Sequence, residues 1–118
     1  MENRYYKLSK RYLKEAKNYL RRKNYTQASE KFWGASAEMV KAVAEKKGYS
    51  HDGHRQLFNV IHKLTEQSKD EEITICFGSA HLLHINFYEN MLKEKETNIY
   101  AQQVKKLVDK LKKFYKNE

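Results

Sequence analysis

The most apolar stretch of the chain covers residues 73–92, which read ITICFGSAHLLHINFYENML. An α-helix turns about 100° per residue, so this stretch places one set of side chains on a single stripe: Ile73, Phe77, Ala80, His84, Phe87 and Met91. Ile75 and Leu82 fall on the opposite side of the same helix. A helix that is apolar on more than one side is central in its domain or covered by a partner. We therefore expect this helix at the centre of the fold or in a dimer interface.

Composition favours long amphipathic helices in one domain. The 118 residues include no proline and only four glycines, and 33% of them are charged. No apolar run approaches the roughly 18 residues of a membrane span, and the N-terminus lacks the apolar core of a signal peptide. We expect a soluble, cytoplasmic protein without membrane contact. The single cysteine, Cys76, cannot form an internal disulfide and is expected to be a buried, unreactive thiol.

Helical periodicity and end signals predict an all-α fold. We expect a single-domain, up-and-down bundle of about five helices, over residues 3–23, 25–47, 51–67, 71–93 and 98–116. Asn24 is expected to cap the second helix and Gly48 to end it, whereas Ser50 and Thr97 are expected to cap the third and the fifth. Small residues recur along the second helix, which predicts that it is the innermost and runs antiparallel to the first.

The net charge of +9 is concentrated in the two terminal segments. Residues 1–23 hold nine Lys/Arg and two Glu, residues 97–118 hold six Lys and two acids, and residues 24–96 hold nine basic and eleven acidic residues. If the first and fifth helices pack side by side, they form one basic surface that attracts nucleic acid or a nucleotide. The alternative is a solvated lysine face. Tyrosines on the apolar stripe of the first helix are expected at the edge of the core.

Two His-x-x-His pairs occur, His51–His54 and His81–His84. Residues three apart on a helix share a face, so the two pairs together could offer imidazoles to zinc or nickel. No cysteine or acidic pattern reinforces this spacing, and the Glu-x-x-His pattern of di-iron bundles is absent from the sequence. We therefore predict no cofactor, and a metal-binding bundle built on these four histidines stays a third hypothesis.

His84 lies in the middle of an apolar stripe. It is either a core histidine, with Tyr88 one turn away as its hydrogen-bond partner, or a proton carrier or phosphate contact at the floor of a cleft or dimer seam. Asn86 points to the other flank, where it could contact a loop or a ligand. Glu30, one turn before Trp33, is either partly buried and paired or exposed. The candidate binding residues are His54, His81, His84, Tyr88, Asn86, Glu30 and Trp33.

Particular segments carry a resemblance to a known family. Ala28–Ala44, Gly48, His54 and Leu83–Glu89 resemble the archaeal PaREP repeat-family proteins, which are small all-α proteins of unassigned activity. The resemblance covers roughly residues 5–110. The helix order also resembles the wider HEPN class (higher eukaryotes and prokaryotes nucleotide-binding). That second resemblance implies a bundle that forms homodimers, and many members of the class are RNA-cutting toxins or partners of small nucleotidyltransferases.

The ribonuclease pattern of the HEPN class is an arginine, about four to six residues, then a histidine, often with a tyrosine after it. His84 and Tyr88 match its second half, but Phe77–Ala80 stand where the arginine should be. Arg55 and His62 fit the bare pattern in the third helix. Without an arginine to stabilise the charge on the scissile phosphate, the resemblance implies the fold and the dimer but not the cleavage.

We therefore predict a non-catalytic, HEPN-like dimeric module that binds nucleic acid, a nucleotide or a toxin–antitoxin-type protein partner. A variant ribonuclease that uses His84, with Tyr88 beside it, is the alternative.

Overall fold

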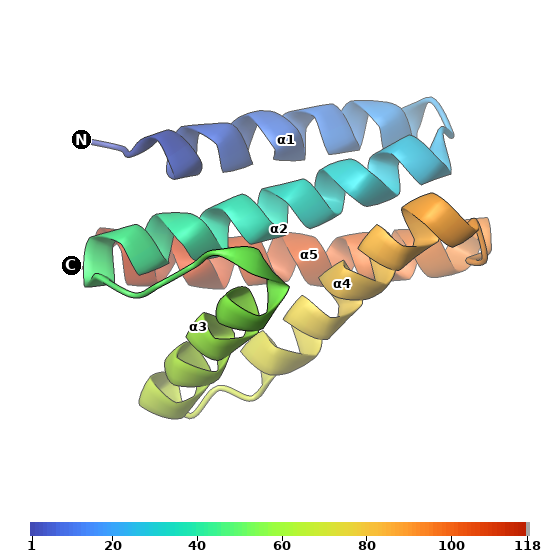
Figure 1. Ribbon diagram of the computed structural model, residues 1–118. Coiled ribbons are helices and arrows are strands. Elements are labelled where there is room, and N and C mark those ends of the chain that lie inside the picture. Colours follow the sequence, from blue (N-terminus) through green and yellow to red (C-terminus); the bar gives the residue numbers. More distant parts are fainter. Residues whose placement is uncertain (118) are drawn as a thin grey trace.

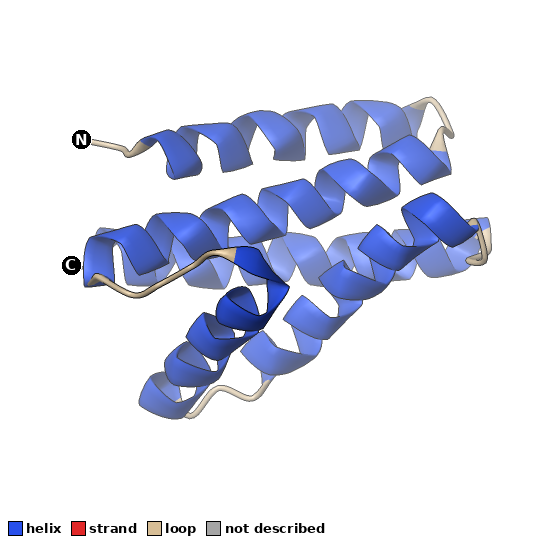
Figure 2. Cartoon of the chain, in the orientation of Figure 1, coloured by secondary structure: helices blue, strands red, loops and turns tan. Residues whose placement is uncertain are grey.

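The computed structural model describes residues 1–117 and contains five α-helices: α1 (Arg4–Arg21), α2 (Tyr25–Lys47), α3 (Gly53–Ser68), α4 (Glu72–Glu89) and α5 (Glu94–Lys116). The described residues form no strand, as Figure 2 shows, which confirms the predicted all-α class. No helix within these residues is both long and apolar enough to cross a membrane.

Helix α2 lies at the centre of the bundle and packs against all four of the other helices. Figure 1 shows α1, α2 and α5 running side by side, whereas α3 and α4 form a V that crosses them obliquely. Alanine and serine side chains fill much of the buried surface of α2: Ala28, Ser29, Ala35, Ser36, Ala37, Ala42 and Ala44. Small side chains allow close approach on every side, so the predicted innermost helix, antiparallel to α1, is confirmed.

The ends of α2 follow the sequence signals. The Asn24 side chain accepts a hydrogen bond from the backbone N–H of Gln27 at 3.3 Å, and Gly48 ends the helix in the left-handed conformation, with φ of 76°.

Two predicted caps are wrong. Helix α3 begins at Gly53, with Asp52 before it as the N-cap residue, and not after Ser50. Gly53 has φ of 82°, in the left-handed region, so a helix that started after Ser50 could not continue through it. Helix α5 begins at Glu94, so Thr97 lies inside its first turn, where Oγ1 donates to the backbone carbonyl of Lys93 at 3.2 Å.

Asn86 decides where α4 ends. Its Oδ1 accepts hydrogen bonds from the backbone N–H groups of Met91 and Leu92, both at 2.8 Å, and its Nδ2 donates to Ser29 Oγ at 3.1 Å. These bonds fold the chain back after Glu89, four residues before the predicted end. Met91, predicted to be in the core, is therefore 52% exposed, while Leu92 packs against the core instead.

The first and fifth helices meet through Tyr115. Its ring stacks on Tyr6 with centroids 4.4 Å apart, and its hydroxyl accepts a hydrogen bond from the backbone N–H of Asn3 at 2.7 Å. This contact brings the two lysine-rich helices together at one end of the molecule. Elsewhere α1 and α5 each pack on α2 rather than directly on each other, so the basic surface expected from side-by-side packing of these two helices stays a prediction.

We predict that Asn86→Ala lowers the free energy of unfolding by about 2–4 kcal/mol, because two backbone N–H groups and Ser29 lose their partner at a buried site. Denaturant unfolding followed by circular dichroism measures the change. Asn59→Ala, on the exposed side of α3, serves as the control and should stay within about 0.5 kcal/mol. Equal stability of the two variants would contradict this role of Asn86.

Candidate functional site

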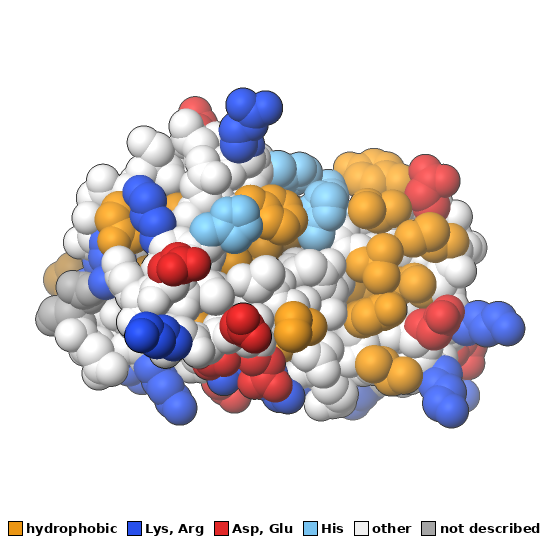
Figure 3. Space-filling model, turned by 90° about the horizontal axis from the view of Figure 1, so that it is seen from below, with side chains coloured by type: hydrophobic (Ala, Val, Ile, Leu, Met, Phe, Trp, Pro, Cys, Tyr) orange, Lys and Arg blue, Asp and Glu red, His pale blue; other side chains and the backbone are white. Residues whose placement is uncertain are grey.

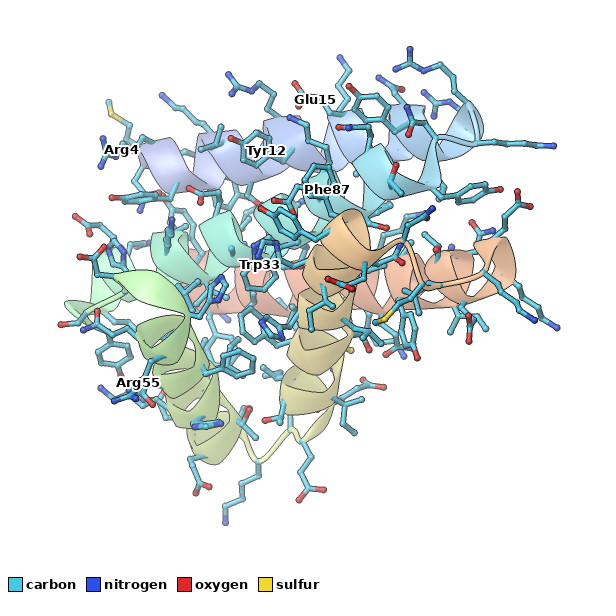
Figure 4. The ribbon with its side chains drawn as sticks, turned by 45° about the vertical axis from the view of Figure 1, so that its right-hand side comes forward. Arg4, Tyr12, Glu15, Trp33, Arg55 and Phe87 are labelled. Carbon is cyan, nitrogen blue, oxygen red and sulfur yellow. The ribbon has the colours of Figure 1, made fainter. Side chains whose placement is uncertain are left out.

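The Trp33 side chain is the hub of an aromatic cluster on α2. The ring is 6% exposed and has four ring neighbours, with centroids 5.2 Å away for His54, 5.5 Å for Phe77, 5.6 Å for His81 and 5.1 Å for His84. Figure 4 shows Trp33 between α3 and α4, which supply these neighbours. We call His54, His81 and His84 the histidine cluster. It contains three of the candidate residues predicted from the sequence, and it forms around a fourth.

The histidine cluster reaches the protein surface. His54 is exposed, and His81 and His84 are half-buried. The ring centroids of His54 lie 5.4 Å from His81 and 5.2 Å from His84, in both cases nearly perpendicular. Figure 3 shows histidine side chains gathered on one face, beside hydrophobic atoms. The cluster is thus accessible to a ligand from solvent.

His51 does not join the cluster, so the prediction that it shares a helix face with His54 is wrong. It lies in the loop before α3, where its Nε2 is 2.9 Å from Glu45 Oε1 and its ring meets the edge of Tyr5. The left-handed Gly53 separates the two histidines structurally. Across residues 1–117, no three or more His, Cys, Asp or Glu side chains are grouped so that they could hold a metal ion. The geometry therefore offers the metal-binding hypothesis no ligand set.

Glu30 is the hydrogen-bond partner of His84. Oε1 of Glu30 lies 2.8 Å from Nδ1 of His84, so Glu30 is the paired, partly buried acid of the two alternatives. Tyr88, the partner expected from the sequence, instead meets the edge of the His84 ring at 5.5 Å and is 68% exposed. A carboxylate on Nδ1 fixes the ring orientation and directs Nε2 elsewhere.

Burial lowers the pKa of His81, and the positive charges that His54 and His84 can carry lower it further. Protonation of His81 is therefore disfavoured, because its charge would be partly buried beside two other imidazoles.

Asn86 takes no part in the cluster. It is 1% exposed and its bonds go to Ser29 and the α4–α5 loop, so the loop contact is its role and a ligand cannot reach it.

Arg55 does not supply the missing arginine of the ribonuclease pattern, since Figure 4 shows it on the side of α3 away from Trp33. Phe77 and Ala80, which stand where the arginine of the ribonuclease pattern should be, are buried.

A cleft of about 310 Å³ adjoins the cluster between α1, α2 and the start of α3. Tyr12, Glu30, Trp33 and His54 line it. Gly34 also lines the cleft. The Tyr12 ring packs directly on it, and a Cβ at this position would lie 2.9 Å from the ring. The two lysines of the cleft are already paired: Lys31 Nζ with Glu15 at 2.8 Å, and Lys41 Nζ with Glu38 at 3.0 Å.

A second hollow, of about 450 Å³, lies between α1 and α5 and is strongly basic. We call its cationic lining the basic groove: Lys10, Lys14, Lys17, Arg21 and Lys112. Only Lys10 is near an acid, with its Nζ 3.4 Å from Glu2; within the described chain, no carboxylate pairs with Lys14, Lys17 or Lys112. The sequence predicted the excess positive charge on the first and fifth helices, but it did not identify the residues of the basic groove. The Glu30–His84 hydrogen bond was not predicted either.

The outward side of α4 is apolar and uncovered within the monomer. Ile75 is 62% exposed, and Leu82 lies half-buried on the same side. Tyr88, on the His84 side of α4, and Met91, just after the helix ends, are exposed as well.

We predict that the protein becomes less stable as the pH falls below about 6.5, because His81 binds fewer protons folded than unfolded. The His81→Gln variant should show a smaller drop in melting temperature between pH 7.5 and pH 5.5 than the wild type. His62→Gln, exposed on α3, is the control. If His81→Gln keeps the wild-type pH dependence, the lowered pKa of His81 is not what makes the protein less stable in acid.

The comparisons with known proteins agree with the resemblance to the archaeal PaREP proteins found in the sequence. The profile of the archaeal PaREP1/PaREP8 family matches residues 4–108. A crystal structure of a protein from Sulfolobus solfataricus is similar over 90% of this chain and 94% of its own, with 28% sequence identity and a TM-score of 0.80. No curated protein matches the chain significantly. The family match covers most of the chain, including Glu30, Trp33 and the histidine cluster, and the chain therefore belongs to the archaeal PaREP1/PaREP8 family.

Proposed function

We propose that this protein is a non-catalytic, dimeric, HEPN-like module that binds nucleic acid through the basic groove. The observation that carries the proposal is a hollow lined by four cations of α1 and by Lys112 of α5, in which, among the described residues, only Lys10 has an acidic partner, Glu2. Unpaired cations gathered in this way gain most from a polyanion, because binding releases the counterions condensed on its phosphates.

The spacing within the basic groove suits a repeating anion. Lys10, Lys14, Lys17 and Arg21 follow one another at four, three and four residues, so they lie along one side of α1. At 1.5 Å per residue they span about 16 Å, long enough to meet several phosphates rather than one. A nucleic acid therefore fits this surface better than a mononucleotide does.

The exposed apolar side of α4 supports the dimeric part of the proposal. A second copy of the chain that packs on Ile75 and Leu82 removes them from water, and burying such side chains is worth about 25 cal/mol per Å². The homodimer implied by the HEPN resemblance would use this face. A small nucleotidyltransferase, the other partner that the resemblance implies, would compete with the second copy for the same surface.

A variant ribonuclease is a second candidate, favoured by one observation. The Glu30–His84 pair lies beside His54, so two imidazoles 5.2 Å apart face solvent together. In such a reaction one imidazole removes the proton of a ribose 2′-hydroxyl, which attacks the phosphorus, and the other protonates the departing 5′-oxygen. Among residues 1–117 the cleft beside them is lined by no unpaired cation that could stabilise the phosphate, which is why binding without cleavage is the first proposal.

We predict that the protein binds RNA and DNA oligonucleotides with an affinity that falls steeply with salt. Lys14→Gln combined with Lys17→Gln should weaken binding and reduce the slope of log K against log salt by about 1–2, since each phosphate contact contributes about 0.7–0.9. Fluorescence anisotropy at several salt concentrations measures both. Lys63→Gln with Lys95→Gln removes the same charge elsewhere and should change the slope less.

Wild-type protein without affinity for either nucleic acid at low salt would refute the basic groove as a binding site. RNA recovered from the same titrations should remain intact. If it is cut, and the cutting disappears in His84→Ala, the ribonuclease is the correct function.

We predict a molecular mass of twice the 14.2 kDa chain mass by light scattering. Ile75→Lys should give a monomer, because a charge then faces the partner's apolar surface at the proposed interface. Ile99→Lys, at an isoleucine of α5 that is 50% exposed, should leave the dimer intact. A monomeric wild-type chain would contradict the dimer.

A further inference from the structure

The flank of α1 that faces away from the basic groove carries a repeated pair of residue types. Tyr5, Tyr12 and Tyr19 recur every seven residues, so they lie on one side of the helix, and each ring is half-buried. A guanidinium lies over each ring: Arg4 at 4.8 Å from the Tyr5 centroid, Arg11 at 5.6 Å from Tyr12, and Arg22 at 5.1 Å from Tyr19. We call these six residues the arginine–tyrosine flank.

The two flanks of α1 differ in the kind of cation that they use. The basic groove is formed mainly by lysine, whereas three of the five arginines in the chain lie over the tyrosines of the opposite flank. Arg4 also donates a hydrogen bond to the Tyr5 hydroxyl at 2.8 Å, and Tyr12 is shared with Lys31, whose Nζ lies 4.7 Å from the ring centroid. Lysine offers a compact point charge, but a guanidinium is planar, weakly hydrated and able to stack. An arginine already held over a tyrosine ring therefore presents a prearranged flat surface, at low entropic cost, to another planar group.

The arginine–tyrosine flank follows the groove between α1 and α2. Arg4, Tyr5, Arg11 and Glu38 line one hollow, and Tyr12, Trp33 and Glu38 line the cleft beside the histidine cluster. Since Glu38 belongs to both, the two hollows adjoin. Figure 4 shows Arg4, Tyr12 and Trp33 in this region. The acids here are occupied: Lys41 holds Glu38, and Lys31 holds Glu15, which also lies 3.8 Å from Arg11.

From this arrangement we infer that the arginine–tyrosine flank binds unpaired bases, so that the nucleic acid ligand is single-stranded. The inference rests on the proposed function, in which the basic groove holds phosphates of the same strand. Because the flank lies across α1 from the groove, the strand crosses over α1, and the bases on the flank belong to other nucleotides than those whose phosphates lie in the groove. Stacking on aromatic rings and guanidinium planes is the usual means of holding single strands, because every base has a π-face that can be covered. The bases of a duplex already stack on one another and cannot reach such a surface. The rings recur about 10.5 Å apart along α1, so separate bases of one strand can use them.

The test compares a single-stranded RNA with a duplex of the same length in fluorescence anisotropy at one salt concentration. Wild-type protein is expected to bind the single strand at least about tenfold more tightly. Arg4→Lys with Arg22→Lys keeps the net charge but removes two stacking planes, and should weaken single-strand binding by about fivefold or more while leaving duplex binding unchanged. Both arginines are exposed, so the variant is expected to fold.

Tyr5→Leu with Tyr19→Leu should give the same selective loss, and Tyr5→Phe with Tyr19→Phe should restore wild-type binding, because phenylalanine keeps the ring. Equal affinity of the wild type for single strand and duplex, with no effect of the arginine variant, would overturn this inference and leave the basic groove in place. Absence of binding to both nucleic acids would overturn the proposed function itself.

Discussion

Close packing around α2 is the constraint on which the rest of the structure depends. All four other helices rest on this one helix, and they can do so because its buried surface is largely alanine and serine. The large side chains of the core, such as Phe32 and Met39 on α2, and Phe77 on α4, fill the spaces that remain. Protein interiors are packed as densely as organic crystals, so enlarging any of these small residues forces a neighbouring helix outward.

The same packing places three chemically different surfaces around one helical pair. Gly34 allows Tyr12 of α1 to lie against α2. Its neighbour Trp33 makes ring contacts with the three histidines of α3 and α4. On its far flank, α1 meets α5 through Tyr6 and Tyr115, and there the lysines gather. Lysine, arginine–tyrosine and histidine surfaces are thus separated by the geometry of α1 and α2, although their residues are mixed in the sequence.

Much of the fold follows from local sequence signals, whereas the site does not. The positions of the five helices, the Asn24 cap and the Gly48 stop depend on residues within one or two turns of each other, which a helical period reveals. The end of α4 was missed because it depends on Asn86, whose hydrogen bonds reach Ser29 across the bundle. The partner of His84 was missed for a similar reason, since Glu30 lies on another helix 54 residues earlier. Histidine spacing suggested a pair at His51 and His54, but the backbone of Gly53 separates them.

The basic groove is the proposed place of a bound nucleic acid. Acetylation of lysines, with and without a bound RNA oligonucleotide and followed by mass spectrometry, tests this at each side chain. Lys14, Lys17 and Lys112 should be protected by the RNA, whereas Lys63 and Lys95 should react as in the free protein. Protection spread evenly over all of these lysines, or confined to those outside the groove, would contradict it.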